Sequence, residues 1–117
     1  MTDLSLQRER YVKALERDLE TLVKQLRGMP EVHKVILFGS FAKGRRDLFT
    51  DLDLIVVMES QDDFVIRCAE LAGRLNVGVA LDLLVYTPGE WEKIQQRAFF
   101  RHALQSGKVL YEREFKS

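Results

Sequence analysis

The chain has 117 residues, 46% of them hydrophobic and 31% charged, a composition typical of one folded globular domain and unlike that of a disordered segment. Lys plus Arg and Asp plus Glu both total 18, so the net charge neither indicates nor excludes a nucleic-acid partner. The single cysteine excludes an intrachain disulfide and a cysteine-based zinc cage. Neither a signal peptide nor a membrane-length apolar run is present, so we expect a cytoplasmic protein with no membrane partner.

Residues 4–27 have the pattern of a long amphipathic helix. Its apolar stripe consists of Leu15, Leu19, Leu22 and Leu26, which recur at the spacing of one helix face. Gly28 followed by Pro30 predicts the end of this helix. The stripe can cover a sheet or bind a partner. A small domain needs its apolar faces for its own core, which favours the sheet.

The rest of the chain alternates short apolar runs with helical patterns. Strands are predicted over 35–38, 52–58, 77–86 and 109–111. Glycine and charged residues between 39 and 50 indicate a loop with room for one helical turn. Ser60 with Asp63, and Thr87 with Glu90, have the spacing of capping boxes and predict two further helices, which end near residues 76 and 107.

The inward faces of these two helices follow from their apolar residues. The first is expected to bury Phe64, Cys68, Leu71, Ala72 and Leu75. The second is expected to bury Trp91, Ile94, Ala98 and Phe99.

The order of elements, α-β-β-α-β-α-β, predicts an α/β (α+β) fold in one domain over 1–117. A helical crossover between the second and third strands predicts that those two are parallel. The direct connection between the first two strands favours an antiparallel pair, so we expect a mixed sheet of three or four strands with helices packed on it. Residues 1–30 supply the N-terminal helix and residues 33–111 the core.

Three aspartates lie where unpaired charge is costly. Asp51 and Asp53 are two residues apart at the start of a predicted strand, so both side chains leave the same face. Asp53 and Asp82 stand inside apolar runs, where a cation between carboxylates would compensate their charge. Oxygen ligands without His or Cys favour Mg²⁺, or Mn²⁺, over zinc. The alternative, an ordinary surface charge at a strand end, stays open above all for Asp51.

The turn after the first strand has the residues of a phosphate site. Gly39 lets the backbone approach a phosphate closely, and Ser40 adds a hydroxyl donor. Lys43, Arg45 and Arg46 follow in the same loop and could neutralise a triphosphate. Each feature taken alone also fits a structural turn or a solvated charge.

Together these residues form Gly39-Ser40, ten residues, then Asp51-Leu52-Asp53. This resembles the signature of the DNA polymerase β-like nucleotidyltransferase superfamily, G-S-x10-D-x-D. The segment GSFAKGRRDLFTDLDLIVV is similar to its minimal nucleotidyltransferase branch, and LDLLVYTPGEWEK to that branch's third-aspartate strand and following helix. The resemblance covers residues 33–111.

The resemblance implies a role for each motif residue. Gly39 and Ser40 would hold the triphosphate, Asp51 and Asp53 would bind two Mg²⁺ ions, and Asp82 would bind the catalytic ion near the attacking hydroxyl. Larger enzymes of the superfamily carry further domains that grip the base or the acceptor, and this sequence shows none. We therefore expect a partner to bring the acceptor, or a homo-oligomer to complete the site.

Minimal nucleotidyltransferases are often paired with a small helical HEPN protein, an RNase toxin, which they bind and in some systems modify with AMP. The resemblance thus implies an enzyme that moves a nucleotidyl group, AMP from ATP, to a hydroxyl of a protein or small molecule, with a HEPN toxin as a candidate partner. The competing hypothesis is a non-catalytic module that neutralises a toxin by masking it. Nucleic-acid binding has only the Lys43, Arg45 and Arg46 cluster in its favour and is not expected.

Overall fold

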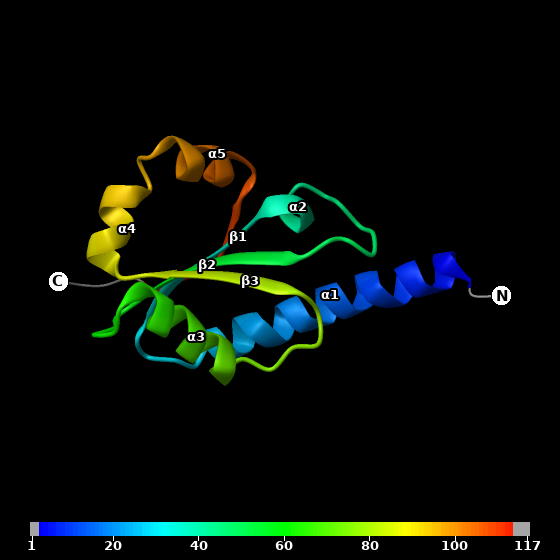
Figure 1. Cartoon of the computed structure of the whole chain (residues 1–117), viewed down its shortest axis with the longest axis horizontal. Coiled ribbons are helices and arrows are strands. Elements are labelled where there is room, and N and C mark those ends of the chain that lie inside the picture. The colour runs from blue at the N-terminus through cyan, green and yellow to red at the C-terminus, as the bar shows by residue number, and fades with distance from the viewer. Residues whose placement is uncertain (1–2, 114–117) are drawn as a thin grey trace.

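The structure is a computed structural model that describes residues 3–113 (Figure 1). The single domain predicted over 1–117 therefore includes six residues, 1–2 and 114–117, that lie outside the described part. In chain order the elements are α1 (Leu4–Arg27), β1 (Val32–Phe38), α2 (Gly39–Ala42), β2 (Leu52–Met58), α3 (Phe64–Arg74), β3 (Leu81–Tyr86), α4 (Pro88–Ile94), α5 (Ala98–Ser106) and β4 (Lys108–Glu112).

The four strands form one mixed sheet in the order β3-β2-β1-β4. β1 is antiparallel to β2 and to β4, whereas β2 and β3 are parallel. These pairings confirm the prediction. Helix α3 provides the crossover connection that the parallel pair of β2 and β3 needs. The predicted helical turn in the 39–50 segment is also present, as α2.

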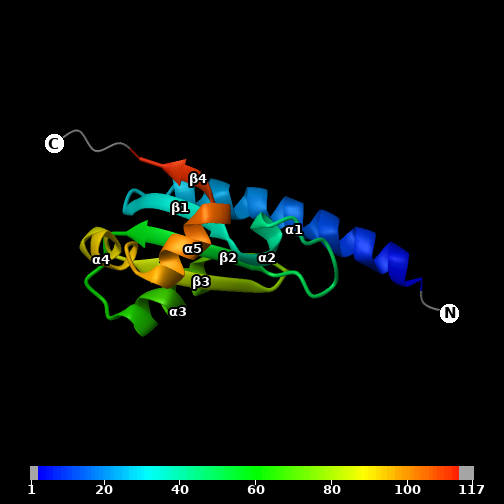
Figure 2. The same cartoon turned by 90° about the horizontal axis from the view of Figure 1, so that it is seen from above.

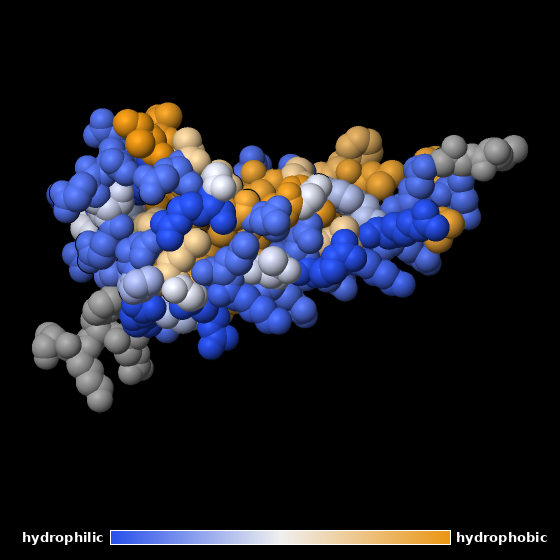
Figure 3. All heavy atoms as spheres, turned by 90° about the horizontal axis from the view of Figure 1, so that it is seen from below, coloured by the Kyte–Doolittle hydropathy of each residue, from blue (hydrophilic) through white to orange (hydrophobic). Residues whose placement is uncertain are grey.

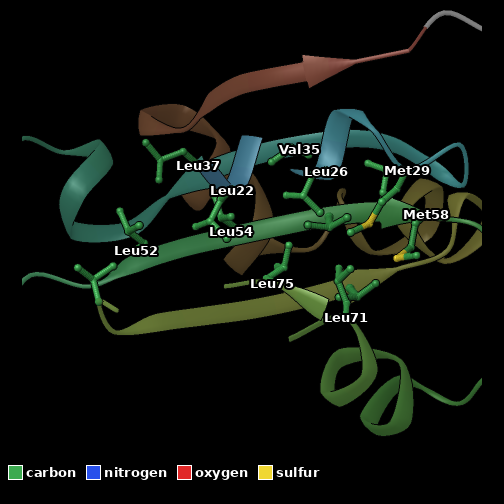
Figure 4. Close-up of a cluster of buried hydrophobic side chains, with 14 of the residues drawn as sticks. Leu22, Leu26, Met29, Val35, Leu37, Leu52, Leu54, Met58, Leu71 and Leu75 are labelled. Atoms are coloured by element: carbon green, nitrogen blue, oxygen red, sulfur yellow. The ribbon is translucent and has the colours of Figure 1, made fainter. Parts of the chain in front are cut away.

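Helices cover both faces of the sheet (Figures 1 and 2). On one face, α1 and α3 pack on alternate residues of β1 and β2, such as Val35 and Leu54 (Figure 4). On the other face, Ile36 and Ile55 contact Trp91 of α4 and Phe100 of α5. Burial on both faces explains why the two central strands are continuously apolar rather than alternating.

Helix α1 has the predicted bounds, and its stripe covers the sheet. Leu15, Leu22 and Leu26 are fully buried, and Leu19 packs against the same cluster. The N-terminal half of α1 extends beyond the end of the sheet (Figure 1), and much of its outer surface is hydrophilic in Figure 3. Within residues 3–113, no helix is both long and apolar enough to cross a membrane.

Three predicted element starts are wrong by three residues or more. Strand β1 begins at Val32 rather than at Val35. Helix α3 begins at Phe64, not near Ser60, because the Ser60 hydroxyl accepts the Asp62 N–H in a local turn instead of capping a helix. The strand predicted from Val77 begins only at Leu81. The segment before it is a loop tied to α1, since the Gly78 N–H donates to the Asp18 carboxylate at 3.0 Å.

The predicted inward face of α3 is only partly correct. Leu71 and Leu75 are buried, but Phe64 and Ala72 are exposed. Arg67 is buried instead, 5% exposed, and its guanidinium pairs with Glu90 at 2.6 Å and donates to the Val85 carbonyl. A buried arginine is tolerated there because its charge and most of its donors have partners.

The predicted last helix is two helices, α4 and α5. The capping box that starts α4 is confirmed, since Thr87 and Glu90 bond reciprocally. Arg97 then takes an extended backbone conformation, with φ −71° and ψ 149°, and interrupts the helix. The interruption changes the helical phase, so Phe100 is buried while Ala98 and Phe99, predicted to face inward, are exposed.

Candidate active site

The sheet register brings the predicted site residues to one end of the molecule. β1 is antiparallel to β2, so its last residue, Phe38, lies opposite Asp53. β3 is parallel to β2 and places Asp82 directly opposite Asp53 on the other side. The turn after β1 and the starts of β2 and β3 therefore meet around the Asp53 carboxylate.

Gly39 lies against this carboxylate and has no room for a side chain. Its φ is +76°, a conformation that L residues rarely adopt. A Cβ placed on Gly39 would lie 2.1 Å from Oδ2 of Asp53. The next residue, Ser40, donates its backbone N–H to the Asp53 carboxylate. Glycine is therefore required here both by its backbone conformation and by the close approach of Asp53.

Asp53 is half-buried and surrounded by negative charge. Burial, then the hydrogen bond and charge of Asp82, then the charge of Asp51, raise the pKa of Asp53 from 3.8 to about 6. The Ser40 N–H opposes this rise, but does not cancel it. The site thus has an excess of negative charge that a proton or a bound cation can compensate.

The donor chemistry fits a divalent ion such as Mg²⁺. The candidate ligands are carboxylate oxygens, which this ion prefers, and at least the Asp53 and Asp82 carboxylates are already in contact. Within residues 3–113, no group of three or more His, Cys, Asp or Glu side chains is arranged as a ready-made metal cage. That does not exclude Mg²⁺, because this ion usually keeps several waters and shares its coordination with substrate phosphates.

The structure corrects the argument from buried charge. Asp82 is exposed, not embedded in apolar surroundings, because β3 is an edge strand of the sheet. Asp51 is half-buried and lies one residue before β2 rather than within it. The reasoning that unpaired charge demands compensation therefore applies to Asp53 alone.

The three cations of the loop after α2 have different surroundings. Lys43 is exposed. Arg45 pairs with Asp47, Nε to Oδ2, at 2.7 Å. Arg46 donates to the Phe41 carbonyl at 2.8 Å, and its guanidinium lies 3.6 Å from the centre of the Phe41 ring. Arg46 is thus engaged in holding α2, whereas Lys43, at the C-terminal end of α2, is exposed.

One contact at this end of the molecule has no signal in the sequence. The Tyr11 hydroxyl of α1 donates to the Thr50 carbonyl at 2.8 Å, directly before Asp51. Local periodicity cannot reveal this hydrogen bond, because its two residues are 39 positions apart in the chain.

Comparison with known proteins gives a consistent result. The family described as "Polymerase beta, Nucleotidyltransferase" matches residues 20–116. A Methanocaldococcus jannaschii protein, provisionally named a protein adenylyltransferase, is 33% identical over 100 residues, which is 85% of this chain and 96% of that protein.

Solved structures share the fold at lower identity. A crystal structure from Sulfolobus solfataricus, provisionally a nucleotidyltransferase, is 18% identical with a TM-score of 0.56, and the alignment covers 97% of this chain and 91% of that one. A toxin–antitoxin structure with AMP-PNP contains a chain that is 22% identical with a TM-score of 0.53, over 81% of this chain and 73% of that one. A chain of the MntA–HpeT toxin–antitoxin is also 22% identical, with a TM-score of 0.51, over 82% of this chain and 73% of that one.

Proposed function

The chain belongs to the polymerase beta nucleotidyltransferase family, and on that premise we propose that it transfers AMP from ATP to a hydroxyl of a protein acceptor, with Mg²⁺ as its metal. Family membership makes the protein a nucleotidyltransferase. The name of the M. jannaschii relative, which this chain matches over nearly its whole length, supports a protein as the acceptor. The AMP-PNP in a toxin–antitoxin structure that contains a chain of this fold supports ATP as the donor.

The observation that carries the proposal is that Asp53 lies against Gly39 on one side and Asp82 on the other, at one end of the sheet. The conformation of Gly39 and its close approach to Asp53 fix the turn against the carboxylate. Register pairing puts Asp82 beside it. A carboxylate pair next to a turn of glycine and serine provides two things that a metal-bound triphosphate needs: anionic ligands for the metal, and a hydroxyl donor beside a glycine that a phosphate can approach closely.

The residues have the following roles in the proposed reaction. The Gly39-Ser40 turn and the Ser40 hydroxyl bind the triphosphate, and Lys43 compensates its charge. The acceptor oxygen forms a bond to the α-phosphorus, while the bond from that phosphorus to the bridging oxygen of the β-phosphate breaks and pyrophosphate leaves. Asp82 is exposed and can therefore be reached by the acceptor, whose hydroxyl proton it takes.

Asp51, Asp53 and Asp82 would hold the metal. Bound Mg²⁺ would stabilise the negative charge that develops on the attacking and leaving oxygens of the in-line displacement. A bound cation would favour the ionised form of Asp53 and so oppose the rise of its pKa to about 6.

We propose a toxin as the protein acceptor, because chains of this fold occur in toxin–antitoxin structures. A HEPN protein is the form of toxin that the resemblance implies. The same observation supports the second candidate, a module that neutralises a toxin by masking it without chemistry.

The experiment uses ATP labelled at the α-phosphate, Mg²⁺ and a co-expressed candidate toxin. Wild type is compared with Asp51→Asn/Asp53→Asn and with a control, Asp62→Asn/Asp63→Asn, which makes the same charge change just before α3. The proposal expects labelled toxin with wild type and control but not with the site variant. Neutralisation without labelling in all three would favour masking and refute the transfer reaction.

A further inference from the structure

The segment that carries Asp51 is held from both sides. The peptide group before Asp51 presents the Thr50 carbonyl, which accepts the Tyr11 hydroxyl at 2.8 Å. The peptide group after Asp51 presents the Leu52 N–H, which donates to the Ala80 carbonyl at 3.0 Å. Because the two flanking peptide planes define φ and ψ of a residue, these two bonds fix the direction in which the Cα–Cβ bond of Asp51 leaves the backbone.

Thr50 itself is fully buried and closes a small turn. Its hydroxyl accepts the Asp47 N–H at 3.0 Å, and its N–H donates to the Asp47 carbonyl at 3.2 Å. These bonds order the turn internally but do not attach it to the sheet or to α1. That attachment on the N-terminal side of Asp51 comes from Tyr11.

Tyr11 can reach this turn because α1 continues past the end of the sheet. The projecting half of α1 runs beside the loop between α2 and β2 in both cartoon views (Figures 1 and 2). The Tyr11 side chain is half-buried and packs against the core, so its hydroxyl is held in place. The length of α1 thus does more than cover the sheet, because the projecting part brings Tyr11 to the turn before Asp51.

We infer that Tyr11 is a positioning residue for Asp51, acting through the Thr50 carbonyl. The inference takes the role of Asp51 as a metal ligand from the proposed function. Its geometric part, that Tyr11 holds the backbone before Asp51, is independent of that function. If it is correct, the hydroxyl of Tyr11 should affect metal binding without contacting the metal. Partners that orient metal ligands in this way commonly change metal affinity by about tenfold or more when they are lost.

The first test is independent of any ligand. In Tyr11→Phe, amide hydrogen exchange at Leu52, measured by NMR, should become about fivefold faster, because one anchor of the segment is lost. The matched control is Tyr111→Phe on the distant strand β4. This change removes a hydroxyl that accepts a hydrogen bond from Arg113. Unchanged exchange in Tyr11→Phe, or an equal change in the control, would overturn the inference.

The second test measures Mn²⁺ binding by electron paramagnetic resonance in the presence of AMP-PNP. Tyr11→Phe should weaken Mn²⁺ binding about tenfold in the wild-type background and have no effect in the Asp51→Asn background. An effect that persists without the Asp51 carboxylate would show that Tyr11 acts by another route and would overturn the inference. If the wild type binds no Mn²⁺, the proposed function fails, and exchange at Leu52 still decides the geometric part.

Discussion

Replacing Gly39 by alanine tests the packing on which the candidate site depends. Alanine at φ +76° costs about 1–2 kcal/mol from backbone conformation alone. The new methyl group would lie 2.1 Å from Oδ2 and 2.8 Å from Cγ of Asp53, so this side chain must move. Turning Asp53 off its rotamer costs about 1 kcal/mol.

Moving Asp53 also takes its carboxylate away from the Ser40 N–H, whose hydrogen bond lowers the pKa of Asp53. The backbone and rotamer terms together bring the expected cost of Gly39→Ala to about 2–3 kcal/mol. At about 4 °C per kcal/mol for a domain of 117 residues, the melting temperature should fall by about 10 °C. Nucleotidyl transfer should be lost even below the melting transition, since Asp53 is displaced.

Gly44→Ala is the matched control, because Gly44 also has a positive φ, +100°, but a Cβ there meets no atom within 4 Å. Its cost should be the conformational term alone, about 1–2 kcal/mol. Denaturant unfolding, followed by circular dichroism, measures both variants. The packing argument is refuted if Gly39→Ala is no less stable than Gly44→Ala, or if adding Asp53→Ala to Gly39→Ala recovers no stability.

Four further outcomes are expected. Because the pKa of Asp53 is raised from 3.8 to about 6, its contribution to stability is complete below pH 3.8 and is lost as the pH rises through about 6. Asp53→Asn should therefore gain stability relative to the metal-free wild type across that window in denaturant titrations, and a constant difference would contradict the shift. Mg²⁺ with ATP at 100 times its Kd should stabilise the wild type by about 2.7 kcal/mol in thermal unfolding, and Asp51→Asn/Asp53→Asn should lose this gain. Arg46→Ala should cost about 1–2 kcal/mol in denaturant unfolding, through its lost contacts with Phe41, whereas Lys43→Ala should weaken labelled-ATP transfer at equal stability. Glu90→Gln should destabilise the protein by about 2 kcal/mol, because buried Arg67 loses its anionic partner, without changing transfer; a parallel loss of activity would contradict its distance from the site.

The local sequence pattern predicted most of the elements and the family. The apolar runs of β1 and β2, the stripe of α1 and the capping box at Thr87 are properties of contiguous residues, and all are confirmed. The spacing of Gly39-Ser40 and Asp51-x-Asp53 led to a resemblance that family membership confirms. Such signals can be read from the sequence because they depend on helix and strand periodicity and on covalent spacing.

Other features depended on the packing of distant segments. The aromatic cluster determined which side of α5 faces inward after the break at Arg97. In this cluster the ring centres of Phe100 and Trp91 are 5.8 Å apart. The burial of Arg67 depended on acceptors from β3 and α4. No local pattern contains these partners, so the inward faces predicted for α3 and for the last helix were partly wrong.

The candidate site shows the same division. The sequence by itself selected Gly39, Ser40, Asp51, Asp53 and Asp82, because carboxylates in or beside apolar runs and a glycine after a strand are recognisable residue by residue. Only the tertiary structure decided that Asp53 is the crowded carboxylate while Asp82 is exposed, because register and edge position belong to the whole sheet. Only the tertiary structure brought Tyr11 to the peptide group before Asp51, since that contact requires α1 to pass the end of a sheet formed by residues far along the chain.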